Sequence, residues 1–215
     1  MSPRWLRSFE LAKFPGPPAA LPPAQTVIVA SGTLLWRIYS AGGSYPCAWN
    51  AFRYFGPTAS RFDHHVPPAA VSARGILYAS SGGQAILTCI AEVFQTKRFI
   101  DRTTNGPRLA AFSTTRDLTL LDLTGTWPTQ AGASTAIASG PRPRARAWSR
   151  AIYDAFPTVD GLLYGSSMNA NQPAYALYER AATALSLTPT ADRALDDAAL
   201  TTRLAAAAGA LNYRL

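Results

Sequence analysis

The feature that most constrains the fold of this chain is the irregular order of its strand-like and helix-like segments. Strands are predicted over 25–39, where Gly32 separates two β-rich pieces, and over 75–80. Helices are predicted over 83–95 and 142–156, where apolar residues recur at the 3.6-residue helical spacing. Because strands and helices do not alternate in a regular βαβ order, the pattern predicts an α+β fold rather than a doubly wound parallel sheet.

The remaining segments add to this pattern. Residues 109–115 and 117–123 are predicted to be paired strands, and residues 159–167 a strand that runs into a turn. Residues 174–182 read as a strand or a short helix, and residues 191–210 as a terminal helix. Two inward helix faces are expected, one made by Ala85, Ile86, Cys89, Ile90, Val93 and Phe94 and the other by Ala147, Trp148, Ala151, Ile152 and Ala155.

Composition divides the chain into three parts. Residues 1–24 are expected to be a proline-rich lead-in, residues 25–182 the working domain, and residues 183–215 a helical extension rich in alanine. With 215 residues, 48% of them hydrophobic, the chain can bury one substantial core. The long aromatic stretch 40–74 is expected to form part of a binding site, since loops of that length in compact domains are usually functional or disordered.

The net charge of +8 comes almost entirely from arginine, because Lys13 and Lys97 are the only lysines. Two explanations remain open: a phosphate-bearing ligand, which suits guanidinium geometry, or a genome that favours arginine codons. Charged residues interrupt every candidate export signal or membrane span, so we expect a soluble, cytoplasmic protein. Cys47 and Cys89 belong to no metal-binding pattern, and Cys89 is expected to be a core thiol.

Five short motifs, taken in order, resemble the RES domain, a family named for its Arg, Glu and Ser residues. The motifs are LWRIY (35–39), GPTASRFD (56–63), GILYAS (75–80), AILTCIAEVF (85–94) and GLLYGSS (161–167). The chain departs from the family at Ser60-Arg61-Phe62-Asp63, where members commonly have Gly-Arg-Trp-Asn, so an aromatic ring is kept and an amide becomes a carboxylate.

The resemblance implies a single domain with a fold like that of ADP-ribosyltransferases and an enzyme that degrades NAD by hydrolysis or phosphorolysis. Many members are toxins of toxin–antitoxin systems, held inactive by a helix-turn-helix antitoxin. It implies no cofactor, with NAD as substrate and phosphate as an alternative co-substrate to water. Catalytic roles would fall to Glu92, Arg37 and Arg61, and substrate binding to Arg37, Arg61, Tyr78 and Ser166.

These residue types suit the chemistry. Cleavage of the nicotinamide–ribose bond develops positive charge on the ribose, which a carboxylate such as Glu92 can stabilise while it orients the attacking water or phosphate. Nicotinamide leaves as a neutral molecule, so one key carboxylate suffices. Arg37 and Arg61 can meet the pyrophosphate and a second anion, and Tyr78 and Ser166 can contact the nicotinamide or the ribose.

Each candidate also has a purely structural reading. Glu92 can be a solvated helix carboxylate, and Arg37 can form an ion pair with Glu92 or Asp63. Tyr78 can be a core aromatic residue, and Ser167 is an alternative to Ser166. His64 and His65 lack a third ligand at useful spacing, so no metal site is expected, although they can assist substrate binding near the Arg61 loop.

Two other functions remain open. An ADP-ribosyltransferase acting on a macromolecule would use the same residues with a different acceptor. A non-catalytic module would bind nucleic acid through the aromatic stretch and a cluster formed by Arg142, Arg144, Arg146 and Arg150. Because the basic residues are scattered and a solvated helix face explains the cluster, direct contact with nucleic acid is not expected.

Overall fold

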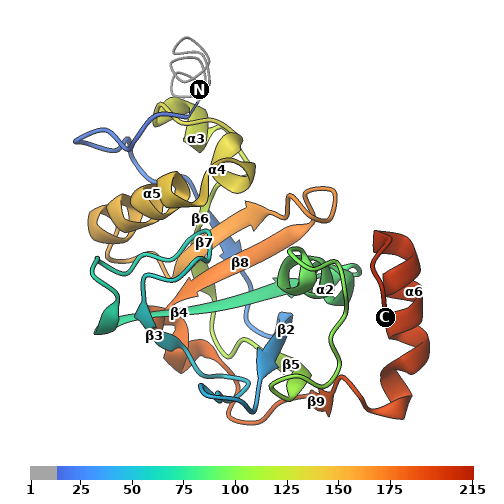
Figure 1. Cartoon of the computed structure of the whole chain (residues 1–215). Helices are drawn as coiled ribbons and strands as arrows, with labels where there is room; N and C mark the ends of the chain where they lie inside the picture. The colour runs from blue at the N-terminus through green and yellow to red at the C-terminus, as the bar shows by residue number, and fades with distance from the viewer. Residues whose placement is uncertain (1–13) are drawn as a thin grey trace, which may run out of the picture.

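A nine-stranded sheet runs through the computed structural model, which describes residues 14–215 (Figure 1). Along the sheet the strands are β1 (Thr26–Val29), β6 (Leu118–Asp122), β7 (Gly161–Gly165), β8 (Pro173–Tyr178), β4 (Ala70–Ser81), β2 (Leu34–Ser40), β5 (Pro107–Ser113) and β9 (Ala191–Ala194). The ninth strand, β3 (Arg53–Gly56), pairs with β4. Neighbouring strands are antiparallel except for β6 and β7, and the α+β architecture is the one predicted.

Helices gather in two groups around this sheet (Figure 1). The first group comprises α3 (Trp127–Gln130), α4 (Ala136–Ser139) and α5 (Arg142–Ala155), whose buried side chains Trp127, Ile137, Trp148 and Ile152 join one core cluster with Leu162 and Tyr164 of β7. The second comprises α2 (Ala85–Phe94) and α6 (Thr201–Leu211), which pack together with Trp36 and Ile38 of β2. Two short 3₁₀ turns, η1 (Glu179–Ala184) and η2 (Ala198–Leu200), complete the elements.

The sheet has a gap beside the middle of β4. β2 pairs with β4 only at Leu35↔Ser81 and Trp36↔Ser80, whereas it pairs with β5 along its whole length. β3 joins β4 farther along the strand, beginning at Arg53↔Ile76. The segment of β4 between these contacts, residues 77–79, therefore has a strand partner on the β8 side only, and side chains can enter the space on the other side.

The prediction that 109–115 and 117–123 pair with each other is wrong. Both segments contain strands, but β5 lies between β2 and β9, and β6 lies between β1 and β7. The β1–β2 turn and the β5–β6 turn bind each other instead: Gly32 N donates to Thr114 O at 2.8 Å, and Ser31 N donates to Asp117 Oδ1 at 2.8 Å. The β1–β2 and β5–β6 connections therefore lie side by side. Each connects two strands that are not neighbours in the sheet.

Other local predictions also need correction. The 40–74 stretch is not wholly irregular, because it contains β3 and the start of β4. The terminal helix begins at Thr201 rather than 191, and the segment before it forms β9 at the sheet edge. Residues 183–215, expected to be an extension, thus supply a strand and a core-packed helix. On the helices, Val93 and Ala155 are exposed, while Thr88, Ala145 and Ser149 take up buried positions.

The part of the lead-in that the structure describes, residues 14–24, is anchored to the domain. The Phe14 side chain is buried in the core cluster of α5, and the indole of Trp148 donates to Pro15 O at 2.8 Å. Trp127 donates in the same way to Pro23 O at 3.0 Å. Residues 1–13 lie outside the described residues. Within residues 14–215, no helix has the length and apolar character needed to cross a membrane.

Candidate active site

The gap between β2 and β4 holds a small cavity of about 50 Å³. Three of the five predicted site residues, Arg37, Tyr78 and Glu92, line it. They come from three different elements, β2, β4 and α2, and meet because the strands separate just where α2 crosses the sheet. The other lining residues are Ile38, Ala79, Ser80, Thr88, Cys89, Val93, Tyr164 and Ala174.

Arg37 ties β2 to the loop that precedes β3. Its Nη1 donates to two carbonyl oxygens, Trp49 O and Ala51 O, each at 3.0 Å. Burial lowers the pKa of Arg37 to about 10, so the guanidinium is still charged at neutral pH. No carboxylate of residues 14–215 lies within ion-pair distance, so the alternative of a salt bridge with Glu92 or Asp63 is wrong. Its Nε is buried without a hydrogen-bond partner among the same residues.

Glu92 is held by a serine in the turn that follows β7. The Ser166 hydroxyl, fully buried where β7 runs into a turn, donates to Glu92 Oε1 at 2.5 Å. The same turn contacts α2 a second time, since Asn169 Nδ2 donates to Thr88 Oγ1 at 2.9 Å. Ser167 is exposed, and it is Ser166 that contacts Glu92. Glu92 is therefore an oriented, half-buried carboxylate rather than a freely solvated one.

Tyr78 of β4 also lines the cavity. Its hydroxyl is buried and makes no hydrogen bond within the described residues, and burial raises the pKa of Tyr78 well above its usual value. Burial likewise raises the pKa of Cys89 to about 12, which leaves a neutral thiol, and Cys89 is buried as expected. The cavity thus contains aromatic and neutral groups around the Glu92 carboxylate and the Arg37 guanidinium.

Arg61 does not line the cavity. Its Nη1 donates to the carbonyl of Gly140, in the turn between α4 and α5. Burial lowers the pKa of Arg61, and the nearby Arg142 lowers it further, whereas the Glu92 carboxylate raises it. Arg61 therefore lies at the edge of the site. It is close enough for the Glu92 charge to affect its pKa, but its hydrogen bond is to the turn between α4 and α5.

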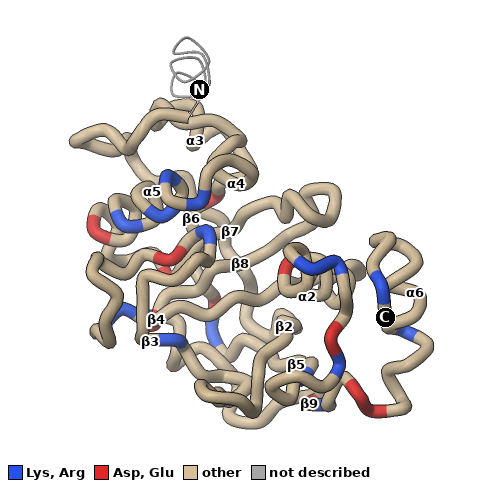
Figure 2. Tube along the Cα trace, viewed as in Figure 1, with Lys and Arg blue, Asp and Glu red and all other residues tan. Residues whose placement is uncertain are grey.

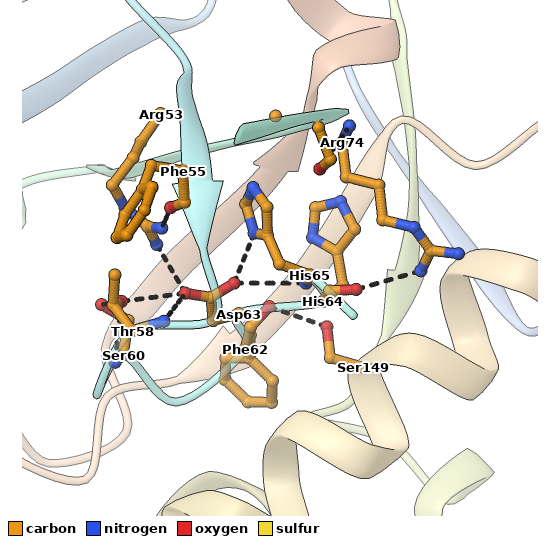
Figure 3. A network of polar contacts seen from close by, with 12 residues as sticks. Arg53, Phe55, Thr58, Ser60, Phe62, Asp63, His64, His65, Arg74 and Ser149 are labelled. Carbon is orange, nitrogen blue, oxygen red and sulfur yellow. Dashed lines mark hydrogen bonds and ion pairs between the residues drawn. The ribbon is translucent and has the colours of Figure 1, made fainter. Parts of the chain in front are cut away.

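The residues that follow Arg61 are structural. The Phe62 ring is fully buried and packs on Tyr164 with centroids 4.6 Å apart. Figure 3 shows the Asp63 carboxylate at the centre of a polar network that holds this loop. Asp63 Oδ2 accepts from Thr58 N at 2.6 Å and from Arg53 Nη2 at 2.9 Å, and Oδ1 lies 2.5 Å from His65 Nδ1. The Asp63 carboxylate is therefore matched by cationic and backbone donors.

His64 and His65 do not face the cavity. Both are buried, and His64 stacks on Tyr153 of α5 with ring centroids 4.4 Å apart. Burial lowers the pKa of His64, although Glu179, 3.8 Å from its Nε2, acts in the opposite direction. His64 packs between Tyr153 of α5 and Tyr178 of β8, and neither histidine is among the cavity residues, so their help in substrate binding stays a prediction. Among residues 14–215, no three His, Cys, Asp or Glu side chains are grouped as metal ligands.

Several site residues were not predicted from the sequence. Thr88 lies one helical turn before Glu92 and Tyr164 lies two residues before Ser166, so each shares a face with a predicted residue. This spacing is the signal that identifies them. Gln95 donates from Nε2 to Glu92 O at 2.6 Å and receives a hydrogen bond from Arg142 Nη2 at 2.7 Å. Nothing in the local sequence indicates that link.

Two of the four arginines in the basic cluster of α5 make hydrogen bonds to other parts of the domain within residues 14–215. Basic positions lie along this helix in Figure 2, with an acidic position at one end. Arg142 binds Gln95, and Arg144 Nη1 donates to Phe14 O at 3.2 Å.

A larger cavity of about 490 Å³ lies elsewhere, between the start of α2 and the alanine-rich face of α6, and none of the predicted site residues line it.

Comparison with known proteins bears on the fold. No family model matches the chain, and no curated protein matches its sequence. A chain in the crystal structure of the M. tuberculosis MbcT–MbcA toxin–antitoxin complex matches it with a TM-score of 0.52 and 19% sequence identity, over 83% of this chain and 92% of that chain. The match confirms the single α+β domain expected from the resemblance to the RES domain: the chain shares its fold with a component of a toxin–antitoxin complex.

Proposed function

We propose that this protein degrades NAD by cleaving its nicotinamide–ribose bond, and that it is the toxin of a toxin–antitoxin pair. The observation that carries the proposal is the Glu92 carboxylate, held by Ser166 in a gap of the sheet that Arg37 and Tyr78 also line. The likeness to a chain of a toxin–antitoxin complex supports the toxin role and an antitoxin partner. A helix-turn-helix antitoxin is our expectation from the RES resemblance.

In this proposal Glu92 stabilises the positive charge that develops on the ribose as the bond to nicotinamide breaks. The bonding electron pair leaves with the positively charged nicotinamide ring, which becomes neutral, so no proton donor is needed. Water or phosphate then forms the new bond at the same ribose carbon, and Glu92 orients it and can accept the proton of water. The Ser166 hydroxyl holds Oε1 at 2.5 Å and Gln95 Nε2 lies 3.4 Å from Oε2, so the carboxylate is already oriented before substrate binds.

The cavity dimensions indicate which part of NAD it would take. About 50 Å³ is far below the roughly 300–1,000 Å³ of typical small-molecule pockets, so the cavity accommodates only one end of a dinucleotide. Aromatic Tyr78 and Tyr164 and the neutral Cys89 thiol suit the nicotinamide end. The phosphates would then lie outside the cavity, toward the edge where Arg61 stands.

The test is to incubate the purified full chain with NAD, with and without phosphate, and to identify the products by mass spectrometry. We expect loss of NAD with release of nicotinamide, and a fall of about 100-fold or more in rate for Glu92→Gln, which keeps the side-chain shape. Asp196→Asn, at an exposed carboxylate, is the matched control and should retain full activity. NAD that stays intact with the wild-type chain would refute the proposal.

The same experiment separates the alternative outcomes. ADP-ribose as product indicates hydrolysis, and ADP-ribose phosphate formed only with phosphate present indicates phosphorolysis. Labelled NAD that leaves its label on a macromolecule would instead establish an ADP-ribosyltransferase. Growth arrest on expression, relieved by Glu92→Gln, tests the toxin role.

A further inference from the structure

We propose that Arg61 and Arg142 form a subsite for phosphate oxygens at the edge of the Glu92 cavity. The inference rests on the proposed function for its biological role, but phosphate binding can be measured without any reaction. The sequence predicts that Arg61 meets an anion, and it places Arg142 in a basic cluster explained by a solvated helix face or by contact with nucleic acid. The structure gives Arg142 a position that this assignment does not explain.

Arg142 is connected to Glu92 through one glutamine. Arg142 Nη2 donates to Gln95 Oε1 at 2.7 Å. Gln95 Nε2 in turn donates to Glu92 O at 2.6 Å and lies 3.4 Å from Glu92 Oε2. The N-terminal end of α5 is thereby linked to the C-terminal end of α2, beside the carboxylate that we propose to be catalytic.

Arg61 also contacts the segment at the start of α5. It donates to the carbonyl of Gly140, two residues before Arg142 in the chain. Two guanidinium groups from distant parts of the sequence are thus gathered at the start of α5. Neither has a carboxylate within ion-pair distance in residues 14–215.

Two like charges near each other are unfavourable when no anion lies between them, and Arg142 is the second cause, after burial, of the lowered pKa of Arg61. An oxyanion bound between the two guanidinium groups would remove the repulsion and accept charge-assisted hydrogen bonds from both. This electrostatic arrangement favours a ligand with phosphate oxygens over a neutral one.

Arg37 occupies a different place. It lines the cavity itself, and its Nη1 donates to the carbonyls of Trp49 and Ala51. In this proposal Arg37 shapes the cavity, and Arg61 and Arg142 bind phosphate oxygens. These oxygens belong either to the pyrophosphate of NAD or to a phosphate co-substrate, and both have the same recognition chemistry.

The first experiment measures binding of inorganic pyrophosphate to the full chain by titration calorimetry at constant ionic strength. We expect Arg142→Gln to weaken binding by about tenfold or more, and Arg142→Lys, which keeps the charge but loses the fork, to weaken it less. Arg146→Gln removes the same charge from the same helix and should change affinity by less than about twofold. Thermal unfolding of every variant verifies that the fold is retained.

Equal effects of Arg142→Gln and Arg146→Gln, or no binding to the wild-type chain, would overturn the subsite. A second experiment distinguishes the two sources of phosphate. If Arg142→Gln raises the KM for NAD and free phosphate competes, the subsite holds the dinucleotide. If phosphate accelerates turnover and the variant raises the KM for phosphate, it holds the co-substrate. Pyrophosphate binding through Arg142 without NAD consumption would support the subsite and refute the proposed reaction.

Discussion

Replacing Asp63 by asparagine tests whether the loop that carries Arg61 is held by a buried charge. The Asp63 side chain is fully buried and accepts hydrogen bonds from Thr58, Arg53 and His65 (Figure 3). Burial by itself raises the pKa of Asp63, but these donors outweigh it and lower the pKa from 3.8 to about 2. The folded state therefore stabilises the ionised carboxylate.

The magnitude follows from this pKa. Lowering a pKa by one unit corresponds to about 1.36 kcal/mol of stability. The change in the pKa of Asp63 from 3.8 to about 2 therefore represents about 2 kcal/mol. Because the folded-state pKa lies below the unfolded one, this contribution is complete above pH 3.8 and is lost as the pH falls through about 2. Asparagine keeps an acceptor but cannot carry the charge.

The assay is urea unfolding followed by tryptophan fluorescence at several pH values. Asp63→Asn should lower the free energy of unfolding at pH 7 by about 2 kcal/mol more than it does near pH 2. Asp196→Asn, at an exposed carboxylate, should show no such pH-dependent difference. A destabilisation by Asp63→Asn that is the same at every pH, or absent at pH 7, would refute the electrostatic explanation.

Three further predictions concern separate parts of the domain. Ser166→Ala should slow NAD loss about tenfold or more, because Glu92 loses a charge-assisted hydrogen bond. Ser167→Ala, at the exposed neighbouring serine, should leave the rate unchanged. Equal rates for the two variants would contradict the role of Ser166. Leu204→Ala should lower the free energy of unfolding by about 2–5 kcal/mol in urea titrations, since Leu204 is fully buried in α6. Arg203→Ala, exposed beside it, should change stability by less than about 0.5 kcal/mol, and similar values for the two would mean that α6 is not part of the core. Arg37→Lys should lower thermal stability, because an ammonium group cannot reproduce the guanidinium geometry that spans Trp49 O and Ala51 O, and an unchanged melting temperature would contradict that bridge.

Local patterns identified many of the individual elements. The apolar spacing in 83–95 predicted α2, and the β-rich pieces around Gly32 predicted β1 and β2, because these signals depend on residues a few positions apart. The same reasoning failed for β9, where an alanine-rich segment suggested helix. Pairing with β5 at the sheet edge favours an extended strand there. Residue propensity alone cannot indicate this, because the partner strand is distant in the sequence.

The sequence by itself determined that the chain is an α+β domain and named the residues Arg37, Tyr78, Glu92 and Ser166 through the order of its motifs. Only the tertiary structure decided that Ser166 holds Glu92, that Arg61 stands outside the cavity beside Arg142, and that His64 and His65 are buried without lining the cavity. The physical reason is that the gap between β2 and β4 depends on strand register and on crossing connections between distant segments. Contacts across such a gap join residues far apart in the chain, and short-range periodicity carries no information about them.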